Sequence, residues 1–382
     1  MAIYFTLAIM LLVGSCFNEG LCLRTTPLLE RNKSSVRGEK LYYFLCCSFM
    51  VAIVAFRADF WTDQYGYTYI FNAVSDRSFF ELISSGTRYT NGNDYLFYLF
   101  TKIISMITDD VHVYFGIIAL ITYIPIFYII AKYSKAPFFS LLFIFTTGFF
   151  FSSFNVIRSC MVYGLSTLLI RSLKERKLLL YIVCITFLSL LHSSAILLIP
   201  VYFIVRIPLL DKKHFLITLT CLIIFYVGFG YLFALADRLL VGGLYATQYS
   251  GINTTGGSLG MIIPSVFVLV LMLSMLKCIN WNNHEERILA NGTLIWCAMG
   301  ISVMAMRLMT RFSDMMFIFP ALFVPRLVMK LRPRNKDGIT VQRTTIFLLM
   351  SILLILRLVQ TMSDSPFNPY YTYLEEVFLL FR

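Results

Sequence analysis

Asn155 and Arg158 place an amide and a guanidinium between two apolar runs, Pro137 to Phe151 and Ser159 to Ile170. An arginine that deep in apolar sequence costs roughly 2.5–3.5 kcal/mol on membrane-insertion scales, so we expect a binding partner to offset the cost. Arginine is always charged, and its planar fork matches the oxygens of a phosphate. The segment therefore predicts a cation that holds an anionic group. A salt bridge at a helix corner is the structural alternative.

Further polar groups occur at equivalent places later in the chain. His192 lies inside another apolar stretch, and because an imidazole titrates near neutral pH, it is a candidate to take a proton from an attacking hydroxyl. Arg307 and Arg311 are one helical turn apart and share a face, and Asp314 follows closely. A hydrogen bond in a turn is the alternative for His192, and ordinary flanking charge is the alternative for the two arginines.

A third group of candidates lies in the stretch 57–111, where acidic residues outnumber basic ones among many aromatics. Arg57, Asp59 and Asp63 can pair with one another or with a ligand, and a simple salt bridge in the loop is the alternative. Tyr67 belongs to a set of aromatic rings that could stack on sugar faces, although anchoring at a membrane interface explains many such rings.

The composition indicates which elements hold these groups. Of 382 residues, 59% are hydrophobic and 14% are charged, whereas a soluble domain is nearer a quarter charged. Apolar runs of about 15–23 residues recur from end to end, which is long enough for helices that cross a bilayer. We therefore expect an all-α, polytopic integral membrane protein that forms a single membrane domain over residues 1–382.

The basic residues indicate how the chain crosses the membrane. The net charge is +12, and the basic residues form short clusters between apolar runs. This pattern is typical of the positive-inside rule, so we interpret the clusters as cytoplasmic loops and expect no nucleic-acid partner. The topology has about 12 transmembrane helices, with both chain ends outside. Residues 57–111 then form a large periplasmic loop, and residues 237–260 form a second one.

Two segments have special roles in this topology. Counting residues 95–107 as a span would put every later basic cluster outside, so they are expected to form a helix at the outer interface. Residues 178–205 are too long for one span and short for two, which favours a tight helical hairpin with His192 in its turn. The topology places nine polar residues on the outer side: Arg57, Asp59, Asp63, Asn155, Arg158, His192, Arg307, Arg311 and Asp314.

The cysteines and histidines do not predict a metal site. None of the nine cysteines forms a CxxC pair, and the sequence contains no HExxH motif. Most of the cysteines lie inside apolar runs, where packing explains them. We therefore expect neither a metal nor a cofactor.

The order of these residues resembles that of the EpsG family, which is similar to the Wzy-type polymerases of bacterial surface polysaccharides. The resemblance covers roughly residues 1–331. It rests on Arg57-x-Asp59, then Asp63 and Tyr67, then Phe80-Glu81, then Asn155-x-x-Arg158, then Leu191-His192-Ser193-Ser194-Ala195 after a basic loop. The chain departs from the family pattern at Ser159, where glutamine is usual, and at Ala58, where glycine is frequent.

The resemblance implies a reaction, a location and partners. An oligosaccharide repeat linked to undecaprenyl diphosphate would be transferred to a sugar hydroxyl of a second lipid-linked repeat. The site would face the periplasm from the bacterial inner membrane, among membrane lipid, and a chain-length regulator is a candidate partner. The residues expected to be catalytic are His192, Arg158 and Asp59. Those expected to bind substrate are Arg57, Asp63, Tyr67, Asn155, Arg307, Arg311 and Asp314.

Three other functions remain open. A flippase for the same lipid-linked sugar would suit a chain with two related halves, but the sequence shows no internal repeat. An O-antigen ligase would suit a large outer loop late in the chain, whereas the longest outer stretch here comes early. A non-enzymatic partner of a glycan assembly complex would have no ligand to offset its buried arginines. The polymerase is therefore favoured.

Overall fold

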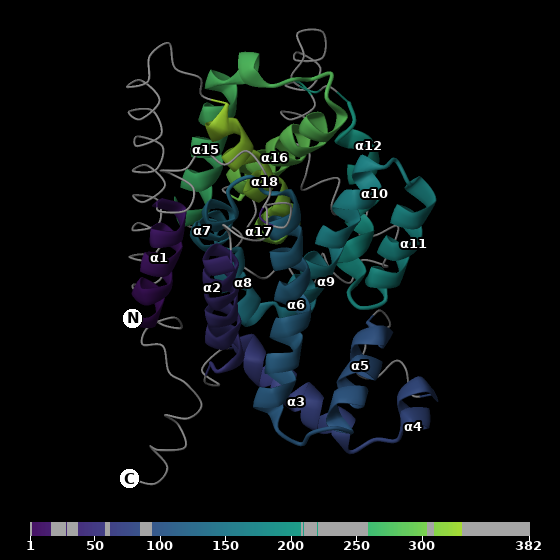
Figure 1. Ribbon diagram of the computed structural model, residues 1–382. Coiled ribbons are helices and arrows are strands. Elements are labelled where there is room, and N and C mark those ends of the chain that lie inside the picture. Colours follow the sequence, from purple (N-terminus) through teal and green to yellow (C-terminus); the bar gives the residue numbers. More distant parts are fainter. Residues whose placement is uncertain are drawn as a thin grey trace.

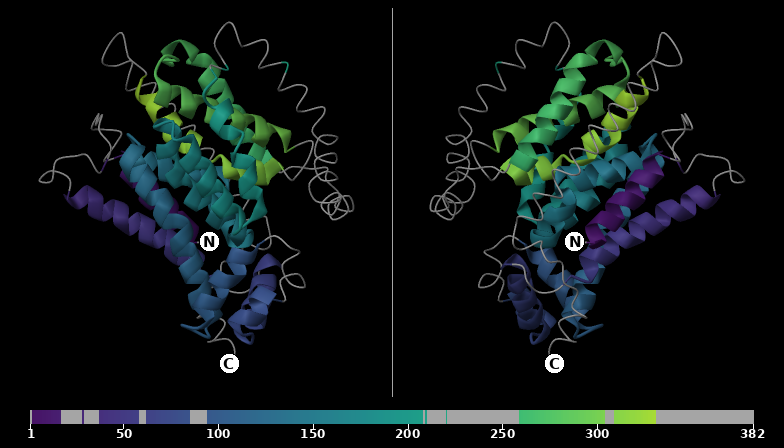
Figure 2. Two further views of the ribbon diagram at one scale, coloured as in Figure 1. Left: turned by 90° about the vertical axis from the view of Figure 1, so that its right-hand side faces the viewer. Right: turned by 90° about the vertical axis from the view of Figure 1, so that its left-hand side faces the viewer.

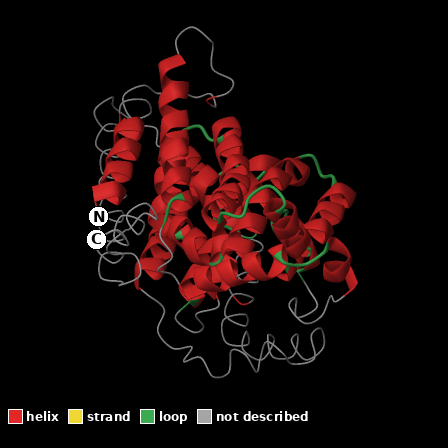
Figure 3. Ribbon diagram, turned by 90° about the horizontal axis from the view of Figure 1, so that it is seen from below, coloured by secondary structure: helices red, strands yellow, loops and turns green. Residues whose placement is uncertain are grey.

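The computed structural model describes residues 2–16, 28, 37–57, 62–84, 94–207, 209, 220, 259–303 and 309–330. All elements in these ranges are helices, as the sequence predicted, and no strand occurs among them (Figure 3). Figure 1 shows a bundle of helices with a small layer, α3 to α5, at one end. Two of the apolar runs that the sequence predicts to cross the membrane, 215–236 except Thr220 and 344–359, lie outside the described residues, as does almost all of the second loop at 237–260. The single membrane domain stays a prediction.

Among the described residues, two helices are long and apolar enough to cross a membrane alone. They are α2 (Arg37–Ala55) and α6 (Val111–Tyr133). The two helices pack against each other, and the Tyr43 hydroxyl of α2 donates a hydrogen bond to the Phe127 carbonyl of α6 at 2.9 Å. The shorter apolar helix α1 (Ala2–Gly14) packs beside α2.

Two further helix pairs are bent. α7 (Pro137–Thr147) and α8 (Phe149–Asn155) meet at 55°, and α17 (Met309–Met315) and α18 (Ile318–Met329) meet at 60°. The first break falls at Gly148, whose φ of 101° lies in the left-handed region that residues with a Cβ rarely adopt. The described residues hold two candidate spans, or up to four if each bent pair is one span. This number fits a membrane protein but does not confirm the larger number that the sequence predicted.

The stretch expected as an outer loop folds into helices. They are α3 (Thr62–Ser75), α4 (Phe79–Ser84) and α5 (Tyr95–Ser105). Both α3 and α4 pack against α5, whose buried side includes Phe97 and Ile104. The helix that the sequence predicted at 95–107 is therefore present, while its place at a membrane surface stays a prediction.

After α8 ends at Asn155, the chain continues as a nearly continuous helical rod that a short 3₁₀-helix interrupts. It consists of α9 (Ile157–Ser166), the 3₁₀-helix η3 (Thr167–Leu169) and α10 (Ile170–Lys174). The rod crosses α6 closely because Gly164 has no side chain, and a Cβ there would lie 2.2 Å from the carbonyl oxygen of Thr122. A small residue at such a crossing lets two backbones approach each other, as is common in membrane proteins.

Residues 178–205 form the hairpin that the sequence predicted. Its elements are α11 (Leu178–Ser189), η4 (Ser193–Leu198) and α12 (Val201–Ile204). The Tyr181 hydroxyl donates a hydrogen bond to the Leu198 carbonyl at 2.9 Å, so the two arms lie side by side. His192 therefore occupies the turn, as expected.

The last described helices gather around α16. They are α15 (Leu259–Ser274), η5 (Leu276–Cys278), α16 (His284–Ser302), α17 and α18. The helix α16 packs against α15, α17 and α18. Figure 2 shows this group, coloured green to yellow, at the end of the bundle away from α3 to α5.

Candidate active site

Asp94 joins three groups that come from distant parts of the chain. Its Oδ2 accepts a hydrogen bond from Arg158 Nη1 at 2.8 Å and lies 3.2 Å from His192 Nδ1. Its Oδ1 accepts a hydrogen bond from the backbone N–H of Ser193 at 3.3 Å. The side chains of Asp94, Arg158 and His192 are 9%, 27% and 18% exposed. The cluster is therefore largely shielded from solvent, yet it can still be reached.

Asp94 reaches the hairpin because it stands directly before α5. Aspartate is a favoured N-cap residue, but this side chain makes no capping bond to its own helix. It accepts instead from the first N–H of η4, where the preceding residue His192 has an extended backbone. A second bond, from the Leu96 N–H to the Leu190 carbonyl at 3.0 Å, also holds α5 against the hairpin.

Arg158 is positioned by a break between two helices. It is the second residue of α9, which begins directly after its N-cap residue Val156. Its Nε donates a hydrogen bond to the Tyr67 hydroxyl at 3.4 Å, and its guanidinium carbon lies 5.6 Å from the ring centroids of both Tyr67 and Phe97. Burial raises the pKa of Tyr67, and the Arg158 charge opposes that rise. Rings from α3 and α5 thus enclose the guanidinium together with Asp94.

Asn155 fixes the beginning of α3 at the same corner. Its Oδ1 accepts a hydrogen bond from the backbone N–H of Asp63 at 3.3 Å. The first N–H groups of a helix have no partner within it, so Asn155 supplies a cap from α8. Five residues selected from the sequence therefore lie around one corner: Asn155, Arg158, His192, Asp63 and Tyr67.

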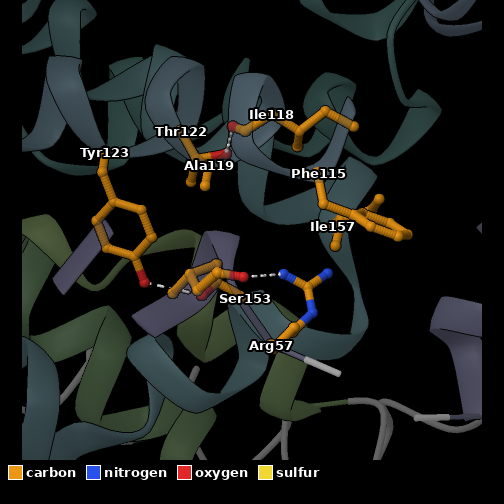
Figure 4. Close-up of a pocket in the computed structure, with 9 residues that line it drawn as sticks. Arg57, Phe115, Ile118, Ala119, Thr122, Tyr123, Ser153 and Ile157 are labelled. Atoms are coloured by element: carbon orange, nitrogen blue, oxygen red, sulfur yellow. Dashed lines mark hydrogen bonds between the residues drawn. The ribbon is translucent and has the colours of Figure 1, made fainter. Parts of the chain in front are cut away.

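Arg57 points into a small cavity inside the bundle. It is 2% exposed, its Nη1 donates to the Val54 carbonyl at 2.5 Å, and its Nε donates to Gln64 Oε1 at 3.0 Å. Figure 4 shows it at the wall of a small cavity, beside Phe115, with room for about one water molecule. Sites for drug-sized ligands measure roughly 300–1,000 Å³, so this cavity is far too small to hold one. The hydrogen bonds of Arg57 thus link α2 to α3. Its expected contact with substrate stays a prediction.

Arg311 and Asp314 approach α9 from another direction. They lie on α17, which packs against α9, and Asp314 is buried. Both charges act on Cys160 of α9. Cys160 stands two residues beyond Arg158, so the two side chains face nearly opposite sides of the helix. The structure thus places a second charged group on the other side of α9 from the cluster around Asp94.

Two residues selected from the sequence, Asp59 and Arg307, lie outside the described residues. Asp94, in contrast, was not selected from the sequence, because it was counted only among the acidic residues of the outer loop. The signal was its position directly before an amphipathic helix, where an aspartate either caps that helix or presents its carboxylate to another element. In the described ranges, no three His, Cys, Asp or Glu side chains gather in a way that could hold a metal ion.

The arrangement around Asp94 is suited to base catalysis beside an anion. A carboxylate at Nδ1 holds an imidazole with its proton on that nitrogen, so that Nε2 of His192 can accept a proton from a hydroxyl. Arg158 adds a permanent positive charge next to the imidazole, where phosphate oxygens could bind. Together these groups fit the transfer of a sugar from a phosphate leaving group to a hydroxyl.

The comparisons with known proteins find one family. The model of the EpsG family matches residues 40–372, which is most of the chain and includes every residue of the cluster. No curated protein and no solved structure matches the chain.

Proposed function

Because the chain belongs to the EpsG family, whose members are Wzy-type polysaccharide polymerase-like proteins, we propose that it polymerises lipid-linked oligosaccharide repeats in surface polysaccharide synthesis. The donor is a glycan on undecaprenyl diphosphate, and the acceptor is a sugar hydroxyl of a second lipid-linked repeat. The bond between the donor sugar C1 and the diphosphate oxygen breaks. A bond between C1 and the acceptor oxygen forms, and undecaprenyl diphosphate leaves.

The observation that supports this reaction best is the contact of Asp94 with both His192 and Arg158. Nε2 of His192 takes the proton of the acceptor hydroxyl as that oxygen attacks C1. Asp94 fixes the imidazole and stabilises the positive charge that develops on it. Arg158 holds the diphosphate and offsets the negative charge that grows on the leaving oxygen. Its side chain is 27% exposed, so an anion can approach it.

The other residues selected from the sequence have supporting roles in this proposal. The hydroxyl of Tyr67 accepts a hydrogen bond from Arg158 and its ring lies beside the guanidinium, so Tyr67 limits the directions in which Arg158 can point. Asn155 and Asp63 hold the beginning of α3 in place over the corner. We propose that Arg311 and Asp314, on the other side of α9, contact a more distant part of the substrate. No role is assigned to Asp59 or Arg307 beyond the one that the sequence predicted.

The site faces the periplasm in this proposal, and the protein crosses the inner membrane. Basic residues from distant parts of the chain meet far from Asp94 and the layer of α3 to α5, which supports this orientation. Lys174 Nζ lies 2.8 Å from Glu285 Oε2, and Arg326 pairs with the same glutamate. Lys174 belongs to the cluster after α9, whereas Arg326 lies just before the most basic loop. Positive-inside orientation places both in the cytoplasm.

The test is the size of the surface glycan on a gel in a strain that lacks the gene. The intact gene, His192→Gln and Asp76→Asn are each returned to that strain, and the abundance of each protein in the membrane is measured. Asp76 is an exposed carboxylate of the same outer layer, so its variant is the matched control. We expect a full ladder with the intact gene and with Asp76→Asn. With His192→Gln we expect a single repeat.

Other outcomes would replace the proposal. If deletion removes all glycan while lipid-linked repeats accumulate inside the cell, the protein is a flippase. If long lipid-linked polymer accumulates without transfer to its final acceptor, it is a ligase. A full ladder from His192→Gln at normal abundance would remove His192 from the mechanism.

A further inference from the structure

A second group of cations meets far from Asp94, where α10 ends, α12 ends and α16 begins (Figure 1). Arg206 Nη2 donates a hydrogen bond to the Leu173 carbonyl at 2.7 Å. The same carbonyl faces His284, and Arg287 Nη2 lies 3.3 Å from His284 Nδ1. Arg176, in the loop after α10, adds a further charge that acts on His284. Four basic residues from three elements thus converge.

The carboxylates of the same helix turn are engaged elsewhere. The three arginines supply the strongest side-chain charges that act on His284. Glu285 and Glu286 lie between His284 and Arg287 in the first turn of α16. Their partners lie on α10 and α18: Lys174, Arg326 and Lys330. Like charges in contact raise the free energy of the folded state unless an anion lies between them.

One nitrogen atom of this group points to the same requirement. Arg287 Nε is buried and has no hydrogen-bond partner among the described residues. An arginine Nε can only donate, so this atom calls for an acceptor. Arg287 stands in the first turn of a 19-residue helix, where the helix dipole also favours a negative charge.

The flank of this group is apolar and exposed. Phe203, Ile204 and Ile207 are 51%, 39% and 44% exposed, and they surround Arg206 in the sequence. In a membrane protein such side chains face lipid tails. We propose that Arg206, His284 and Arg287 bind the phosphate of an anionic phospholipid, whose acyl chains lie along α12. By the positive-inside rule this lipid belongs to the cytoplasmic leaflet. The proposal does not depend on the polymerase reaction.

The test is the thermal stability of the full-length protein in a neutral detergent with three additives. A lipid that binds only the folded state raises Tm, so we expect phosphatidylglycerol to raise it by about 4 °C or more at saturation. Phosphatidylcholine and inorganic phosphate should each change Tm by less than about 1 °C. The site variant is Arg206→Gln/Arg287→Gln, which should lose at least half of the shift. The control is Lys132→Gln/Arg171→Gln, which removes the same charge from exposed positions and should keep it.

A milder variant keeps the test decisive if the site variant does not fold. Arg287→Lys retains the charge but removes the Nε donor, and it should need about tenfold more phosphatidylglycerol for half of the shift. Equal shifts in the site and control variants would show a general charge effect and overturn the proposal. A shift of equal size with inorganic phosphate would assign the site to free phosphate instead of lipid. Equal shifts with both lipids would exclude recognition of an anionic lipid.

Discussion

The carboxylate of Asp94 lies 3.2 Å from the imidazole of His192, although the two residues are 98 positions apart. The contact joins the layer of α3 to α5 to the hairpin of α11, η4 and α12. Asp94 also binds Arg158 at 2.8 Å, so one carboxylate sets the positions of both the proposed base and the proposed anion-binding group. This relationship gives the first prediction.

Asp94→Asn should reduce polymerisation at least about a hundredfold while the protein remains in the membrane at normal abundance. An asparagine can still accept the Ser193 N–H bond, so the hairpin stays docked. Its amide N–H₂ can donate to Nδ1 of His192 and so favour the wrong tautomer. The measurement is glycan length on a gel together with the amount of protein in the membrane. A normal ladder from Asp94→Asn would show that this carboxylate has no part in the reaction.

The sequence predicted the members of this cluster better than it predicted their connection. Asn155, Arg158 and His192 could be selected because polar residues in apolar runs are costly and therefore conspicuous. Asp94 stands in a polar stretch, where a carboxylate is ordinary. Its importance comes from a hairpin about a hundred residues later, and no local pattern reports such a contact.

In the fold, too, local features could be predicted from the sequence, whereas contacts between distant residues could not. Helix content and the hairpin at 178–205 follow from apolar runs and their lengths, and both are confirmed. The bends at Gly148 and between α17 and α18 were not predicted, because an apolar run indicates the length of a helix and not its direction. Arg57 was expected beside a ligand; the structure shows Gln64 and the Val54 carbonyl accepting its hydrogen bonds, and contact with a ligand stays a prediction. Many partners can satisfy a buried arginine, and the sequence does not say which one does.

Arg158→Lys should polymerise at least about tenfold more slowly than the intact protein and faster than Arg158→Ala. Lysine keeps the positive charge, but it has no planar fork to contact Asp94, Tyr67 and a diphosphate together. The measurement is the rate of chain growth on purified lipid-linked repeats at several donor concentrations. If Arg158 holds the diphosphate in the transition state, kcat falls. A change in KM alone would limit its role to ground-state binding.

Gly164→Ala should lower the stability of the protein by roughly 1–3 kcal/mol, because the new Cβ would meet backbone that cannot easily move. Its position would be 2.2 Å from the Thr122 carbonyl oxygen, at the crossing of α9 and α6. Gly116→Ala, on α6, is the control, because its Cβ would lie 3.8 Å from the Ala55 side chain, in ordinary contact. Thermal unfolding of both purified variants provides the measurement. Equal Tm values would mean that α9 and α6 are not in close contact.

Glu285→Gln should destabilise the protein by about 1–3 kcal/mol, because it leaves two cations side by side without their carboxylate. Glu285 is 29% exposed and lies between Lys174 and Arg326, which come from α10 and α18. Glu175→Gln is the control, since Glu175 pairs with Arg171 and Lys177 only in an exposed loop, where ion pairs contribute little. Unfolding temperatures at low and high salt separate the two cases. The partly buried network of Glu285 should keep most of its effect at high salt because solvent ions screen it less than they screen the loop. If both variants unfold at the same temperature, Glu285 does not hold α10, α16 and α18 together.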